Sequence, residues 1–262
     1  MTTLAEYGNG GCIQPLANGT TGEIIVMGNS GPAWATGNDI AVVPPSGFSS
    51  TELGDLLAEM TSAIGVTRAS RLLIADGNSI SDDPAPVYAS GGFRSWPYWI
   101  MNQTSTPIVN TAVGATDIAE CRQRAPINVD KLYGVALQTW VIIWEGTNHL
   151  SRNGGNVAAT YAQHVSYCNE RKAAGATKVY IGTIISREPS VGYSIAQKNA
   201  FNTLLRNNWS FFCDGLLDFA SIPQLGGDTS YADTNYFYDG IHPTDAGSKL
   251  LADYVIAQLG LV

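Results

Sequence analysis

Apolar and polar positions follow two patterns that alternate from about residue 70 to the end of the chain. Short apolar runs typical of buried strands are separated by stretches in which apolar side chains recur at helical spacing. The predicted strands span residues 71–75, 107–112, 135–144, 178–185 and 215–219. The predicted helices span residues 91–102, 116–123, 157–174, 194–208 and 245–259. This order indicates an α/β fold in which helices cover both faces of a parallel central sheet.

The beginning of the chain has a different pattern. Residues 1–67 contain six acidic residues and no Lys, Arg or His, and they are rich in Gly and Thr. Short apolar runs at 24–26 and 40–43 lie between turn signals, and two consecutive prolines follow them. We therefore predict that residues 1–45 form a short extended or β-rich segment that serves attachment or assembly.

Residues 46–262 are predicted to form one larger domain that begins with a helix. Ser49 and Glu52 make a capping box, and apolar residues continue at helical spacing to Ile64. We expect the apolar stripe of this helix to pack against the sheet. A chain that starts near Pro45 should therefore still fold.

The composition narrows the classes of partner. The chain has 262 residues, of which 45% are hydrophobic and 14% charged, and its net charge is −8. This charge does not favour nucleic acid or an anionic membrane, because both attract basic surfaces. No apolar run reaches the length of about 18 residues that suggests a membrane span, and the first residues do not form a secretory signal. We expect a protein of the cytoplasm or of an exported or phage-like assembly. The sequence leaves open whether the protein forms a homo-oligomer.

The cysteines and histidines give no sign of a metal site. The cysteines are widely spaced and could be paired in three ways, but buried free thiols are the simpler interpretation. They stand at positions 12, 121, 168 and 213. The histidines, at positions 149, 164 and 242, form no zinc-binding HExxH pattern. We predict neither a metal nor a cofactor.

Two short motifs point to nucleophilic catalysis. Ser79 lies in a Gly-containing turn directly after a predicted strand, where a side chain can stand clear of its own backbone. His242 follows Asp239 by three residues in the loop before the last helix. A histidine held by a carboxylate is the base that would activate a serine hydroxyl. Taken alone, Ser79 could be a turn residue and Asp239 a helix cap.

Gly114 and Asn148 follow two other predicted strands, and both suit an oxyanion hole. In parallel α/β sheets, ligands bind beyond the carboxyl ends of the strands. We therefore expect Ser79, Gly114, Asn148 and His242 to meet along one edge of the sheet.

Four stretches, ADGNSIS, VNTAVGAT, WEGTNHL and DGIHPT, resemble in this order the motifs of the SGNH or GDSL-type hydrolase family. The resemblance covers residues 70–260 and implies a flavodoxin-like three-layer α/β/α fold. It also implies ester hydrolysis through an acyl-enzyme, with Ser79 as nucleophile and the pair of Asp239 and His242 as its base. The implied oxyanion hole consists of the backbone N–H groups of Ser79 and Gly114 and the side chain of Asn148.

Two positions depart from the family pattern. Asn78 and His149 stand where the family often has aspartate. Neither belongs to the implied triad, so the reaction type is unchanged, but hydrogen bonds around the site and the pH profile would differ. His149 could bind substrate, although a structural role is the simpler interpretation. Among the aromatic residues beside the motifs, Trp96 and Tyr238 are candidates for lining the pocket, with the core as the alternative.

The prediction is a serine carboxylester hydrolase without a metal, acting on short-chain acyl esters. The family suggests O-acetyl groups on carbohydrate as the substrate, while thioesters and lysophospholipids stay open. The alternative is a glycan-binding surface appendage with secondary or no esterase activity. It rests on NGTTGEIIVMGNSGPAWATG, which resembles Gly/Thr-rich connecting segments of phage tail fibres. A metal-dependent hydrolase of another family is the third candidate.

Overall fold

The computed structural model describes residues 24–28, 31–35, 69–82, 94–189 and 192–262. At its centre is a five-stranded parallel sheet with the strand order β4-β3-β5-β6-β7. The strands are β3 (Leu72–Gly77), β4 (Ile108–Asn110), β5 (Thr139–Trp144), β6 (Lys178–Gly182) and β7 (Gly215–Leu217). This is the flavodoxin-like order, in which the topology reverses between β3 and β5. The predicted fold class is therefore confirmed, and all five predicted strands are present.

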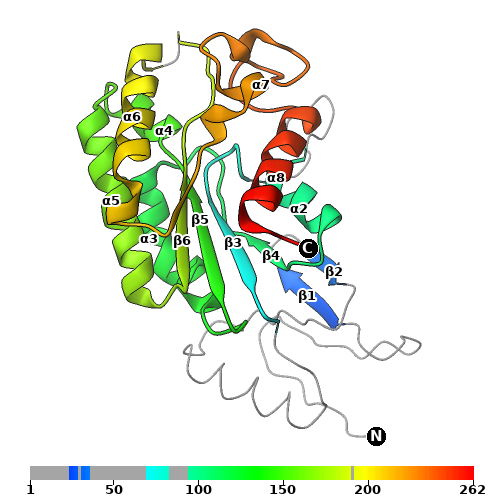
Figure 1. The fold of residues 1–262 in the computed structure, drawn as a ribbon. Helices are drawn as coiled ribbons and strands as arrows, with labels where there is room; N and C mark the ends of the chain where they lie inside the picture. The colour runs from blue at the N-terminus through cyan, green and yellow to red at the C-terminus, as the bar shows by residue number, and fades with distance from the viewer. Residues whose placement is uncertain (1–23, 29–30, 36–68, 83–93, 190–191) are drawn as a thin grey trace, which may run out of the picture.

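The helices form a layer on each face of the sheet (Figure 1). One layer contains α3 (Ile118–Asn128), α5 (Val157–Ala174) and α6 (Ile195–Asn208), and the other contains α2 (Trp96–Gln103) and α8 (Asp245–Leu259). Two short helices, α4 (Thr147–Arg152) and α7 (Pro223–Gly226), lie in connecting segments. Single turns of 3-10 helix span residues 130–132, 209–211, 219–221 and 230–232.

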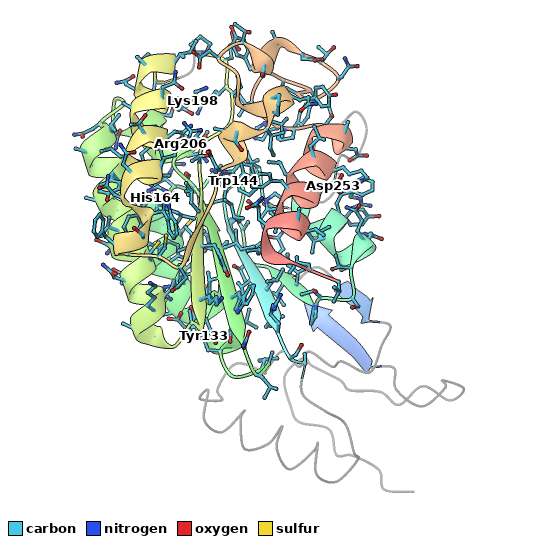
Figure 2. All side chains as sticks on the ribbon, viewed as in Figure 1. Tyr133, Trp144, His164, Lys198, Arg206 and Asp253 are labelled. Atoms are coloured by element: carbon cyan, nitrogen blue, oxygen red, sulfur yellow. The ribbon has the colours of Figure 1, made fainter. Side chains whose placement is uncertain are left out.

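Side chains fill the space between the sheet and both helical layers (Figure 2). Successive strand residues point to opposite faces of a sheet, so each strand contributes to two cores. On β3, Leu72 and Ile74 belong to the core that contains residues of α3, α5 and α6, whereas Leu73 and Ala75 belong to the core that contains residues of α2 and α8. All residues of β3 and β5 are buried, which explains their continuous apolar runs.

Helices α5 and α8 have the predicted bounds because capping residues mark where they begin or end. The side chain of Asn156 accepts the N–H of Ala159 at 3.0 Å at the start of α5, and Gly175 ends the helix with a φ of 114°. At the start of α8, the side chain of Thr244 accepts the N–H of Gly247 at 3.3 Å. This cap follows His242 by two residues, so it also fixes the end of the loop that carries the histidine.

At the N-terminus, β1 (Ile24–Gly28) and β2 (Gly31–Ala35) pair as an antiparallel sheet, with Ile24 opposite Ala35. Strand β1 includes the predicted apolar run at 24–26. The predicted run at 40–43 and the predicted helix that ends at Ile64 lie outside the described residues. The boundary at residue 45 and the attachment role stay predictions.

Two further expectations, on membrane-spanning helices and on the cysteines, can be compared with the described residues only. None of their helices combines the length and the apolar character that crossing a lipid bilayer requires. Three of the four cysteines, Cys121, Cys168 and Cys213, are buried free thiols. Cys12 lies outside the described residues.

Trp96 is a core residue, which is the alternative that the sequence left open for it. Its side chain is fully buried at the first position of α2 and packs against Trp144 and Phe219, with ring centroids 6.4 and 6.3 Å away. The indole Nε1–H donates to Oγ of Ser81 at 3.0 Å. This hydrogen bond links the start of α2 to the turn after β3.

We expect Trp96→Ala to lower the free energy of unfolding by about 3–5 kcal/mol, because a large buried aromatic side chain leaves a cavity. Urea unfolding of the purified variant measures this loss. Tyr98→Ala on the same helix is the matched control and should lose much less, because Tyr98 is only partly buried. Equal losses in the two variants would contradict the placement of Trp96 in the core.

Candidate active site

The turn that carries Ser79 is tied together by Asn78. The Asn78 carbonyl accepts the N–H groups of Ser81 and Asp82 at 3.0 and 2.8 Å, and its side-chain Oδ1 accepts the N–H of Ile80 at 3.0 Å. Asn78 is almost fully buried, so these bonds form in a site with little water. Ser79 is thereby held on a tight turn at the carboxyl end of β3.

Gly77 lets the strand ends approach each other. A Cβ at this position would collide with the backbone carbonyl of Trp144, the last residue of β5. Only glycine permits this contact without moving one of the strands. The close approach brings the turn of Ser79 beside the loop that leads to Asn148, at the reversal of the sheet topology.

Ser79, His242 and Asp239 form a continuous chain of hydrogen bonds. The hydroxyl Oγ of Ser79 lies 2.7 Å from Nε2 of His242, and Nδ1 of the same ring lies 2.7 Å from Oδ2 of Asp239. Both distances are short enough for hydrogen bonds. The structure thus brings together the three residues that the two motifs predicted, across 163 positions of sequence between Ser79 and His242.

The local loop orients Asp239 toward the imidazole. Its Oδ1 accepts the backbone N–H groups of Ile241 and His242 at 2.9 and 2.7 Å, which leaves Oδ2 for the ring. Burial opposes ionisation of the carboxyl, but the hydrogen bonds from His242 and Ile241 outweigh it and lower the pKa of Asp239. The carboxylate is therefore ionised at neutral pH and can stabilise a positive charge on the histidine.

Gly114 and Asn148 lie at the site but are engaged elsewhere in this structure. A Cβ on Gly114 would lie 3.9 Å from Cβ of Ser79, so the two residues are neighbours. The N–H of Gly114 donates to Oδ2 of Asp82 at 2.6 Å. Nδ2 of Asn148, near the start of α4, donates to the carbonyl of Thr116 at 2.8 Å. The Asp82 carboxylate thus occupies the donor that the sequence assigned to a reaction oxyanion.

The two remaining candidates differ in their surroundings. Tyr238 stacks on His242, with ring centroids 5.6 Å apart and an angle of 18° between the planes. His149 contacts the start of α3: its Nδ1 lies 3.4 Å from Oδ2 of Asp117, the residue that caps this helix. This contact favours the structural role of His149, whereas the substrate-binding role of Tyr238 stays a prediction.

Sequence reasoning missed a buried network directly before the nucleophile turn. Asp76 is fully buried, and its carboxylate lies 3.1 Å from Nη2 of Arg124, 2.6 Å from the hydroxyl of Tyr167 and 2.9 Å from the hydroxyl of Thr111. Arg124 also donates to the carbonyl of Gly77 at 2.8 Å. The network fixes the end of β3, and only the polar residue inside an apolar strand could have signalled it.

Comparison with known proteins places this fold in one class. No family model matches the chain, and no curated protein matches it. Solved structures do match, and the chain has the fold of the SGNH/GDSL hydrolases. The fold that the resemblance implied is thereby confirmed.

Three of these structures illustrate the likeness. A member of the lipolytic protein G-D-S-L family from Veillonella parvula matches with a TM-score of 0.56 and 15% identity, over 73% of this chain and 100% of that chain. The lipase/acylhydrolase from Enterococcus faecalis has a TM-score of 0.55 and 15% identity, over 72% and 95% of the two chains. A catalytic mutant of an acetylxylan esterase from Geobacillus stearothermophilus has a TM-score of 0.54 and 13% identity, over 74% and 96%.

Proposed function

We propose that this protein is a serine carboxylester hydrolase in which Ser79 is the nucleophile and His242 the general base. Asp239 holds the histidine in the required orientation. The observation that carries this proposal is the unbroken chain of hydrogen bonds from Ser79 through His242 to Asp239. It lies at the carboxyl end of the sheet, where ligands bind in folds of this type.

The geometry supports acyl transfer in two halves. Nε2 of His242 takes the hydroxyl proton as Oγ of Ser79 attacks the ester carbonyl carbon. His242 then gives this proton to the leaving alcohol as the ester C–O bond breaks, and the acyl group stays on Ser79. In the second half, His242 takes a proton from water as the water attacks the acyl group. The carboxylic acid leaves and Ser79 regains its proton.

The oxyanion of each tetrahedral intermediate requires hydrogen-bond donors. We assign this role to the backbone N–H groups of Ser79 and Gly114 and to the side-chain amide of Asn148. Because an amide nitrogen has two N–H groups, Asn148 can keep its bond to Thr116 and still donate to substrate. Gly114 becomes available when the Asp82 carboxylate turns away from it.

We expect Asn148→Ala to lower kcat by about 10²–10³ and to leave KM nearly unchanged, because an oxyanion donor acts mainly in the transition state. Steady-state kinetics with 4-nitrophenyl acetate measures both values. Asn153→Ala, at the end of the same short helix α4, is the control and should behave like the wild type. A raised KM with an unchanged kcat would assign Asn148 to substrate binding instead.

The substrate we propose is a short acyl ester, with O-acetyl groups on carbohydrate as the class to test first. The likeness to an acetylxylan esterase supports this class, as does the aromatic ring of Tyr238 beside His242. Aromatic faces suit sugar rings as well as acyl chains. The experiment compares 4-nitrophenyl esters of increasing acyl length and measures acetate released from acetylated glycans. A preference for long acyl chains would contradict the proposed substrate class.

A further inference from the structure

Glu145 is a buried carboxyl group that the proposed mechanism does not use. It follows β5 directly, and only 2% of the residue is exposed. Oε2 accepts the N–H of Gly146, whereas Oε1 is buried without a hydrogen-bond partner. Within the part of the chain that the structure describes, no Lys, Arg or His makes an ion pair with it.

The surroundings of Glu145 connect two parts of the proposed site. The side chain of Asn78, which ties the Ser79 turn, and the backbone N–H of Asn148 both interact with the carboxyl group. Glu145 therefore lies between the turn of the nucleophile and the residue assigned to the oxyanion hole. The backbone carbonyl of Glu145 lies 3.0 Å from Nε2 of His164, a residue of α5 (Figure 2).

Burying an unpaired carboxylate is strongly unfavourable, so a carboxyl group in such a place keeps its proton. Burial is the largest influence on Glu145 and raises its pKa to about 8, although Asn78 and Asn148 act in the opposite direction. The charged and titratable groups that face it from the surrounding elements are few. They are Asp117 and Cys121 around α3, Arg152 from α4, His164 from α5 and Tyr193 from the segment before α6.

We propose that Glu145 is a positioning residue that, as the neutral acid, holds the Ser79 turn and the Asn148 segment in their active arrangement. Loss of its proton creates a buried anion that must draw N–H donors or water toward it. The nearest donors belong to Asn78 and Asn148, so the nucleophile and the oxyanion donor move together. This inference rests on the proposed esterase function, because Glu145 acts through those two residues.

The test is the pH dependence of kcat for 4-nitrophenyl acetate, with the rate of Ser79→Ala subtracted at each pH. We expect the activity of the wild type to fall about tenfold between its maximum and about pH 9, because the neutral acid is lost. Glu145→Gln keeps the shape and the neutral state, so it should retain activity near neutral pH and lack the fall. Glu145→Ala should lose about tenfold at every pH, because it removes the carboxyl group that interacts with Asn78 and Asn148.

Asp253→Asn, an exposed carboxylate on α8, is the control and should keep the alkaline fall. The same fall in Glu145→Gln would overturn the proposal. A second measurement is independent of turnover: the infrared difference between the wild type and Glu145→Gln should show a protonated carboxylic acid that ionises above neutral pH and is missing from the variant. Its absence overturns the inference even if the esterase activity is found. Its presence in a protein without esterase activity supports the proton on Glu145 and overturns the proposed function instead.

Discussion

Replacing Ser79 with alanine should reduce ester hydrolysis by about 10⁴–10⁶-fold and leave the fold intact. The size of the loss follows from the mechanism, because without a nucleophile only the oxyanion donors and substrate binding remain. The hydroxyl makes a single described hydrogen bond, to His242, and Ser79 is not part of either core. The measurement is kcat for 4-nitrophenyl acetate, together with urea unfolding to show that the variant is folded.

A neighbouring serine provides the control for this prediction. Ser81 is fully buried and accepts the indole N–H of Trp96 at 3.0 Å. Ser81→Ala should lose about 1–3 kcal/mol of stability, because this donor is left unsatisfied, and should still hydrolyse the ester. Near-wild-type turnover by folded Ser79→Ala would remove Ser79 from the mechanism.

The second large effect is expected for His242→Ala, which should lower kcat by about 10⁴–10⁶-fold because Ser79 then lacks its base. His149→Ala is the matched control. Its imidazole faces Asp117 at the start of α3, so its removal should change kcat far less. Both variants are assayed with the same ester at the same pH. Equal losses in the two variants would mean that the hydrogen bond between Ser79 and His242 does not carry the reaction.

Much of the fold could be predicted because the sequence encodes it locally. Continuous apolar runs mark β3 and β5, which are buried on both faces. Helices α5 and α8 have side-chain caps at their starts, and their bounds were predicted correctly. The proximity of Ser79 and His242 was also predictable, since Ser79 follows β3 and His242 lies in the loop that leads into α8, and such loops meet at the carboxyl edge of a parallel sheet.

Other features depend on contacts between distant parts of the chain. Trp96 stands beside a motif, as a pocket residue would, but the packing of α2 turns it into the core. The bond from Gly114 to Asp82 spans 32 positions, and the one from Tyr167 to Asp76 spans 91. No local pattern carries this information. A polar residue at the end of an apolar strand, such as Asp76 or Glu145, indicates only that its buried carboxyl group needs a hydrogen-bond partner or must keep its proton.

The most direct test of the proposed function is to label the intact protein with a fluorophosphonate, which reacts with activated serine hydroxyl groups. Mass spectrometry then locates the adduct and gives its stoichiometry, while hydrolysis of 4-nitrophenyl acetate is followed in parallel. We predict one adduct per chain, on Ser79, and a loss of activity in proportion to labelling. An adduct on another residue, or full activity in completely labelled protein, would contradict Ser79 as the nucleophile of an esterase.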